Sequence, residues 1–203
     1  KETGSMIAEQ LAHKEISLIL GSNSPRRAAL LNELGFTFSQ RASSVDEIYP
    51  KHLKAGEIAT YLSELKAMAL QSDLTENELL ITSDTVVWCD DRSLEKPQST
   101  EEAIEMLSFL SGKAHKVYTA ISLCNQKRMR SEVDCTQVFF KNLSQDEIHF
   151  YVSNYKVMDK AGAYGIQDWI GLIGIQELKG SYFNVMGLPT HLLYALLHDW
   201  IKD

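Results

Sequence analysis

The chain has 203 residues, of which 44% are hydrophobic and 23% charged, which is typical of one substantial α/β domain or two small lobes sharing a cleft. The formal net charge of −7 disfavours duplex nucleic acid as the main partner, because binding to its phosphate backbone needs a basic surface. Any basic site must therefore be a local feature of the chain.

The cysteines and the apolar runs indicate the kind of compartment. Cys89, Cys124 and Cys135 are odd in number and lack the spacing of a zinc site, which predicts reduced thiols in a cytoplasmic protein. No apolar run reaches the roughly 18 residues that span a membrane, and no signal-peptide pattern is present. The five residues before Met6 are interpreted as a tag remnant, so 6–203 is predicted to be the folded domain.

The stretch Ser22–Arg27 joins a predicted strand to a predicted helix. The apolar run at 17–21 is typical of a short buried strand. Ser24 is a good N-cap and Pro25 suits the first helical position, while Gly35 suits the position just past the helix end. The order strand, polar turn, helix follows from these signals.

Arg26 and Arg27 fall in the first turn of this helix, where a positive charge opposes the helix dipole. Free helix N–H groups and two guanidinium groups at one turn suit a polyanion, and a nucleotide phosphate chain is the predicted ligand. The alternative, that both arginines are solvated surface residues, stays open on local grounds.

The rest of the chain alternates predicted strands with predicted helices. Strands are predicted at 36–42, 79–88, 115–124 and 132–140, the last two as a hairpin. Helices are predicted at 58–69, 99–110, 144–152 and 190–201. The glycine-rich region 161–174 permits sharp turns or close approach to a ligand. This order predicts an α/β fold with a mixed sheet.

Asp84 interrupts the most apolar predicted strand. A carboxylate there is costly to bury unless it is paired or binds a metal, so a general base or a metal ligand is predicted. A hydrogen-bonded core aspartate is the alternative. Glu47 is a second carboxylate source, although alone it is typical of a surface loop. Phosphates beside carboxylates require a divalent cation, because like charges otherwise repel.

Four further polar residues carry weaker signals. Lys66 and Lys96 resemble ordinary solvated lysines, although Pro97 fixes the second of them. The amide of Gln167 is suited to read a base edge or to make a turn hydrogen bond. His115, beside a strand start, is interpreted as structural. The absence of GxxxxGK[ST] and GxGxxG patterns disfavours P-loop and Rossmann folds.

Seven short motifs stand along the chain in the order Ser22–Arg27, Val45–Glu47, Lys66–Ala67, Ser83–Val87, Lys96–Pro97, Gly112–His115 and Lys160–Gln167. Together they resemble the Maf family of nucleoside triphosphate pyrophosphatases, historically called septum formation inhibitors. The resemblance covers nearly the whole chain after about residue 16. The segments Gly162–Gln167 and Gly180–Pro189 are similar to the dTTP/UTP branch rather than the 7-methyl-GTP branch.

The resemblance implies a fold, a reaction and a set of site residues. The fold would be of the Maf/inosine-triphosphatase type, an elongated mixed sheet flanked by helices, with two lobes around a central cleft. The reaction would release a nucleoside monophosphate and pyrophosphate, with Mg²⁺ or Mn²⁺ as cofactor. The implied roles are proton acceptor for Asp84, substrate choice for Arg26, Thr85 and Gln167, phosphate binding for Ser24, Arg27, Lys66 and Lys96, and metal binding for Glu47 and Asp84.

The sequence also leads to expectations about binding partners and to alternative functions. A nucleoside triphosphate is the expected ligand, a homodimer is a further expectation, and neither a membrane nor duplex nucleic acid is expected. Asp168 stands where the family usually has glycine, which adds a carboxylate beside Gln167. The alternatives are a non-catalytic nucleotide-binding regulator of cell division and a pyrophosphatase for 7-methyl-GTP or inosine triphosphate. The Ser-Pro-Arg-Arg turn argues against the inosine type.

Overall fold

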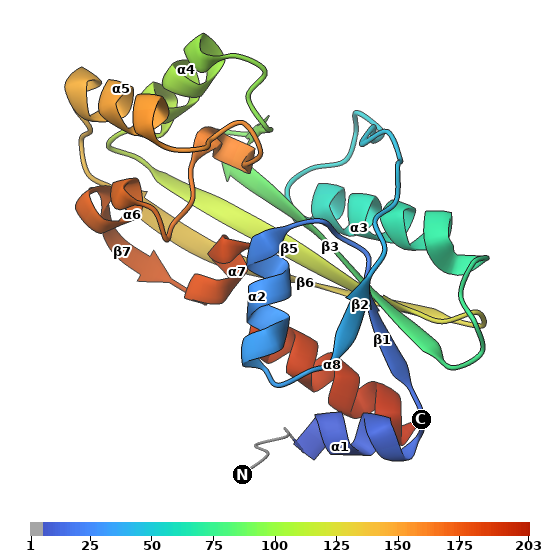
Figure 1. Ribbon diagram of the computed structural model, residues 1–203. Coiled ribbons are helices and arrows are strands. Elements are labelled where there is room, and N and C mark those ends of the chain that lie inside the picture. Colours follow the sequence, from blue (N-terminus) through green and yellow to red (C-terminus); the bar gives the residue numbers. More distant parts are fainter. Residues whose placement is uncertain (1–5) are drawn as a thin grey trace.

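The computed structural model describes residues 6–203, so the five residues interpreted as a tag remnant lie outside the described part. Helices flank one central sheet (Figure 1). The strands in this part of the chain are β1 (Ser17–Leu20), β2 (Phe38–Gln40), β3 (Glu78–Cys89), β4 (Arg92–Leu94), β5 (Ala114–Cys124), β6 (Met129–Phe140) and β7 (Ile175–Lys179). The helices are α1 (Met6–His13), α2 (Pro25–Glu33), α3 (Gly56–Gln71), α4 (Thr100–Leu110), α5 (Gln145–Asn154), the 3₁₀ turn η1 (Ala161–Ala163), α6 (Trp169–Gly174), α7 (Tyr182–Met186) and α8 (Thr190–Lys202).

The sheet is mixed, as expected. Its strand order is β2-β1-β3-β5-β6-β7, with β4 added beside β3. β1 is parallel to β2 and to β3, whereas the other pairs are antiparallel, including the predicted β5–β6 hairpin. The α/β class with a mixed, helix-flanked sheet is therefore confirmed. No helix within residues 6–203 has the length and apolar character that crossing a bilayer requires.

The long strand β3 changes neighbours along its length, and this creates an opening in the sheet. β1 pairs with β3 over Glu78–Ile81, and β4 pairs with it over Val87–Cys89. Between these two stretches, residues 82–86 pair within the described sheet only with β5. One edge of β3 is thus left without a strand partner at Thr82, Ser83, Asp84, Thr85 and Val86.

Alternation along β3 sends neighbouring side chains to opposite faces of the sheet. Leu79 and Ile81 pack with α1, α2 and α8, while Leu80 and Val86 pack with α3. By the same alternation, Asp84 faces α3, whereas its neighbours on either side face α2 and α7. Both sets of side chains reach the opening, because the strand edge there is free.

Two hydrophobic clusters occupy the two ends of the long strands. One contains Ile81 and Ile121 beneath α1, α2 and α8; the other contains Val87 and Val117 and packs with α4, α5 and α6. Figure 1 shows these two groups of helices at opposite ends of the sheet. The polar stretch 82–85 lies between the clusters, so a hydrophilic cleft is placed at the middle of the molecule.

Candidate active site

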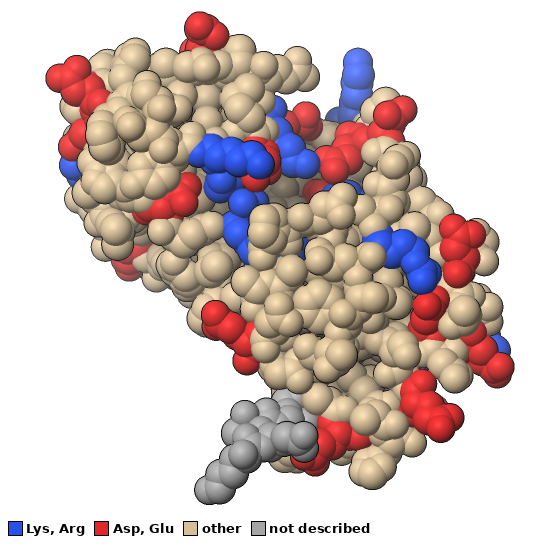
Figure 2. All heavy atoms as spheres, in the orientation of Figure 1, with Lys and Arg blue, Asp and Glu red and all other residues tan. Residues whose placement is uncertain are grey.

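A cleft of about 760 Å³ opens at the free edge of β3. Its size is within the range of small-molecule sites. Its charged lining residues are the basic Arg26, Arg27, Lys66, Lys96, Lys156 and Lys160 and the acidic Glu47, Asp84, Glu95 and Asp159. Six basic against four acidic groups make the cleft locally positive in a chain whose net charge is −7. Figure 2 shows basic side chains gathered at this hollow.

The turn before α2 forms as the sequence predicts. Helix α2 begins at Pro25, and the hydroxyl of Ser24 caps it by accepting from the N–H of Arg27 at 3.4 Å. The hydroxyl of Ser22 accepts from the N–H of Ser24 at 3.1 Å, which stiffens the turn. The N-terminal end of α2 therefore lines the cleft and presents the positive end of its dipole there.

Arg27 is held by two neutral oxygens. Its Nε donates to the carbonyl of Gly187 at 2.7 Å, and its Nη2 donates to Oγ1 of Thr85 at 3.1 Å. Thr85 also shares a hydrogen bond of 2.9 Å with Thr119 on β5. Burial lowers the pKa of Arg27, against the opposing effect of Asp84. The guanidinium is thus oriented by acceptors that leave its charge unneutralised.

The Lys66 cluster, defined as Lys66, Asp84 and Glu47, occupies the α3 side of the cleft. Nζ of Lys66 lies 2.7 Å from Oδ1 of Asp84 and 3.3 Å from Oε1 of Glu47. Asp84 is only 6% exposed. Burial raises its pKa, and Lys66 and Arg27 offset this only in part. Asp84 is therefore a desolvated, hydrogen-bonded carboxyl that lines the cleft.

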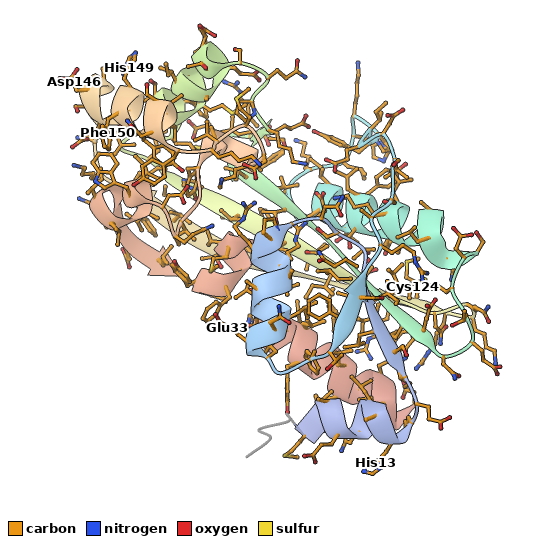
Figure 3. All side chains as sticks on the ribbon, in the orientation of Figure 1. His13, Glu33, Cys124, Asp146, His149 and Phe150 are labelled. Carbon is orange, nitrogen blue, oxygen red and sulfur yellow. The ribbon has the colours of Figure 1, made fainter. Side chains whose placement is uncertain are left out.

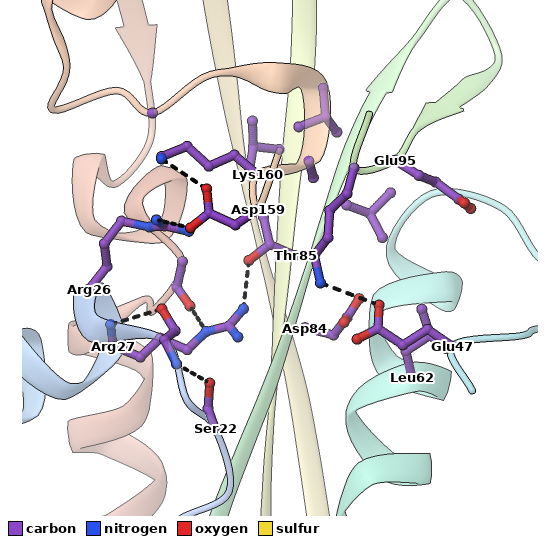
Figure 4. Close-up of a pocket in the computed structure, with 18 of the residues that line it drawn as sticks. Ser22, Arg26, Arg27, Glu47, Leu62, Asp84, Thr85, Glu95, Asp159 and Lys160 are labelled. Carbon is purple, nitrogen blue, oxygen red and sulfur yellow. Dashed lines mark hydrogen bonds and ion pairs between the residues drawn. The ribbon is translucent and has the colours of Figure 1, made fainter. Parts of the chain in front are cut away.

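Glu47 connects the Lys66 cluster to a second lysine. Its Oε2 lies 3.7 Å from Nζ of Lys96 (Figure 4). Burial acts to raise the pKa of Glu47, but Lys66 and Lys96 outweigh it, so the pKa lies below its ordinary value. Tyr49, which the sequence analysis missed, donates to Oε1 of Glu95 at 2.6 Å and ties the Glu47 loop to the segment that carries Lys96.

The donor set fits a cation that shares the oxygens of a substrate. Mg²⁺ is commonly held by one or two carboxylates, with water and substrate phosphates completing its shell. Asp84 and Glu47 converge on one lysine and supply two carboxylates. Residues 6–203 contain no group of three or more His, Cys, Asp or Glu that would form a complete protein cage. A metal would here depend on phosphate ligands.

The Asp159 cluster, defined as Asp159, Arg26 and Lys160, occupies the opposite side of the cleft. Oδ2 of Asp159 lies 3.7 Å from Nη1 of Arg26, and its Oδ1 lies 3.1 Å from Nζ of Lys160 (Figure 4). Burial acts to raise the pKa of Asp159, but Lys160 and Arg26 hold it below its ordinary value. Sequence reasoning gave neither Asp159 nor Lys160 a role, although Lys160 opens one of the seven motifs.

The segment after Lys160 is shaped by its backbone. Gly162 and Ala163 have φ of +71° and +63°, which is unusual for alanine. A Cβ on Gly162 would lie 3.1 Å from both methyl carbons of Val87, so a larger residue would crowd this approach to β3. The glycine-rich region contains η1 and α6, and Gln167 lies between them.

Gln167 lines the cleft and is exposed, and its amide has no hydrogen bond to any residue that the structure describes. Asp168 does not line the cleft: its Oδ2 accepts from the hydroxyl of Tyr151 at 2.6 Å. The carboxylate of Asp168, which was expected beside Gln167, is thus turned away from the cleft. His115 is 2% exposed, bonds to Tyr164 at 2.6 Å and has its pKa lowered to about 4 by burial, consistent with a structural role.

Comparison with known proteins supplies the family. The family described as Maf-like protein matches residues 17–200. The dTTP/UTP pyrophosphatase of Flavobacterium johnsoniae is 45% identical over 95% of this chain and 98% of its own. That of Christiangramia forsetii is 44% identical over 98% of this chain and 100% of its own.

The chain was also compared with solved structures. The structure of a HAM1 protein from Coxiella burnetii covers 91% of this chain and 99% of its own, with a TM-score of 0.47 and 15% identity. The family match and the curated relatives cover nearly the whole chain. The chain belongs to the Maf family.

Proposed function

We propose that this protein hydrolyses dTTP and UTP between the α and β phosphates, releasing a nucleoside monophosphate and pyrophosphate. The observation that carries the proposal is a buried carboxylate, Asp84, at the same cleft as the helix N-terminus that bears Arg26 and Arg27. The names of relatives at 44–45% identity over nearly the full chain support the same reaction and substrates.

The basic residues of the cleft are proposed to bind the triphosphate. The N-terminal turn of α2, with Ser24 and Arg27, would hold phosphate oxygens, because it presents the positive end of the helix dipole and an oriented guanidinium. Lys66 and Lys96 would stabilise the pyrophosphate as its charge develops. Lys96 is exposed and paired with Glu47 at 3.7 Å, so it can exchange this partner for a phosphate.

Asp84 is proposed to act as the general base. Its carboxylate would take a proton from water while the water oxygen bonds to the α phosphorus and the bond to the bridging oxygen breaks, so that pyrophosphate leaves with that oxygen. Lys66, 2.7 Å away, would hold the carboxylate in place. Asp84 and Glu47 would bind Mg²⁺ or Mn²⁺, which when present neutralises phosphate charge.

Base choice is proposed to depend on Arg26, Thr85 and Gln167. The exposed amide of Gln167 offers both a donor and an acceptor, and a uracil or thymine edge presents the complementary pair at N3–H and O4. Thr85 would act through Arg27, to which its hydroxyl is bonded at 3.1 Å. The compartment is proposed to be the cytoplasm, in agreement with three free cysteines. The homodimer stays a prediction.

A substrate panel tests the proposal. Purified protein with Mg²⁺ is incubated with dTTP, UTP, CTP, 7-methyl-GTP and inosine triphosphate, and pyrophosphate is measured separately from orthophosphate. Pyrophosphate released fastest from dTTP and UTP is expected. Release of orthophosphate would contradict the position of cleavage, and a preference for another base would contradict the substrate. Tight binding without turnover would favour the non-catalytic regulator.

A further inference from the structure

An acidic residue in a triphosphate site needs an explanation. A carboxylate among phosphate-binding groups repels the ligand, which makes its presence costly for binding. Glu47 and Asp84 have proposed roles in metal binding and proton transfer. Asp159 has none, yet it lines the same cleft and lies against Arg26 of the phosphate-binding turn.

The carboxylate of Asp159 is held in place by a buried lysine. The side chain of Lys160 is 9% exposed, and its Nζ bonds both to Oδ1 of Asp159 at 3.1 Å and to the carbonyl of Lys156. Because one carboxylate oxygen is held in this way, the other is left to meet Arg26 at 3.7 Å. The carboxylate therefore stands at a defined place on the wall of the cleft.

The backbone that follows Asp159 leads to Gln167, the residue proposed to contact the base. Gly162 donates its N–H to the carbonyl of Glu95 at 3.3 Å and packs against Val87, so the segment is anchored on β3 and on the loop before Lys96. The same segment ends at Gln167. Asp159 thus joins two parts of the chain that are far apart in sequence, the turn of α2 and the segment with the exposed amide.

We propose that Asp159 is a positioning residue that holds Arg26 against the 156–167 segment. The inference rests on the proposed function. In this arrangement the turn of α2, whose Ser24 and Arg27 are proposed to hold the phosphates, is kept at a fixed separation from the segment that carries Gln167. This separation suits a nucleoside triphosphate but neither half of it alone. Lys160 holds Asp159 in place, and Asp159 acts on the nucleotide through Arg26.

The sign of one affinity change tests the proposal. Wild type and Asp159→Asn are titrated calorimetrically, with Mg²⁺, against a UTP analogue that has a methylene group between the α and β phosphates. If Asp159 were only a nearby negative charge, its removal would tighten binding of the polyanion. A positioning role predicts weaker binding instead, by about tenfold, a typical size for coupling between two contacts. Unchanged or tighter binding by a folded variant would overturn the inference.

Two comparisons make the test specific. In an Arg26→Ala background, Asp159→Asn should no longer change the affinity, because the partner is absent; a persisting tenfold loss would overturn the inference. Asp159→Glu, which keeps the charge, should retain most of the affinity, and loss equal to that of Asp159→Asn would count against it. Asp146→Asn is the matched control, since Asp146 is exposed on α5, away from the cleft (Figure 3).

The inference and the proposed function fail in different ways. Turnover of dTTP and UTP is measured on the wild type alone, and its absence overturns the function while the affinity comparison still decides the role of Asp159. Thermal unfolding of each variant shows whether it is folded. If Asp159→Asn does not fold, Asp159→Ala replaces it, with the same expected tenfold loss and the same contrary result of unchanged affinity.

Discussion

The two charged clusters that face each other across the cleft have opposite charge order. In the Lys66 cluster one ammonium lies between two carboxylates, and in the Asp159 cluster one carboxylate lies between two cations. The central charge of each cluster holds the two outer groups together despite their mutual repulsion. The first arrangement gathers the acids needed for proton transfer and metal binding, and the second gathers cations that suit a polyanion.

The clusters also differ in burial and in the elements that carry them. Asp84 lies on the long strand β3 and is 6% exposed, whereas the side chain of Asp159 lies on a loop and is 35% exposed. Burial raises the pKa of Asp84, while neighbouring cations keep that of Asp159 low. A general base benefits from a raised pKa. A residue that only positions its neighbours must remain charged. We call the side of the cleft formed by the Lys66 cluster the chemical wall, and the side formed by the Asp159 cluster the recognition wall.

The largest effect is expected from Asp84→Asn. The substitution keeps the shape of the side chain but removes its ability to accept a proton, so turnover of UTP should fall by about a hundredfold or more, the usual cost of losing a general base. Pyrophosphate release under saturating substrate measures this. Thermal unfolding near that of the wild type serves as the control. A folded variant with nearly normal turnover would remove Asp84 from the chemical wall.

A smaller effect, with a defined pH signature, is expected from Lys66→Met. The ammonium of Lys66 is the main charge that opposes the raised pKa of Asp84, so its removal should raise that pKa further. Since the base must be unprotonated, the acidic limb of the profile of kcat/KM against pH should move to higher pH, and activity at pH 7 should fall by about tenfold. Lys66→Arg, which keeps the charge, should leave the limb near its original position. An unshifted limb in Lys66→Met would show that the lysine does not tune Asp84.

Parts of the site could be predicted from sequence, some through local signals and others through the family motifs. The N-cap Ser24 and Pro25 define where α2 begins, whatever packs around them. Asp84 stands out because an acid within an apolar strand is rare without a reason. Lys66 and Lys96 were recognised through the family motifs, since single lysines carry almost no local signal. Their partners became visible only in the folded chain.

The recognition wall could not be predicted in the same way. Asp159 meets Arg26 only because the chain returns to the N-terminal turn of α2, and no local pattern records such a contact. The elements missed by the sequence analysis, α1, β4, α6, β7 and α7, have eight residues or fewer, too few for periodicity to be informative. Asp168 shows the same limit, because its partner Tyr151 lies on α5 and turns it away from the cleft.

Replacing Gln167 by alanine should alter base choice more than chemistry. The exposed amide makes no hydrogen bond to a described residue, so its loss leaves no unpaired group in the described part of the protein. Discrimination between UTP and CTP should weaken by about fivefold, in line with one hydrogen bond. The ratio of kcat/KM for the two nucleotides measures this, with Gln137→Ala on β6, which does not line the cleft, as the control. An equal loss for both nucleotides would contradict a reading role and assign Gln167 to general binding.

The smallest effect is expected from Lys156→Gln, which separates the recognition wall from its surroundings. Lys156 also faces Asp159, at 4.0 Å, but its side chain is 81% exposed. Exposed ion pairs contribute little because water screens them, so affinity for the methylene UTP analogue should change by no more than about twofold at 0.15 M salt. Lower salt should enlarge the effect, since less screening strengthens the attraction between this lysine and the phosphates. A tenfold loss, equal to that of Asp159→Asn, would show that cationic charge around Asp159, and not its contact with Arg26, determines how tightly the nucleotide is held.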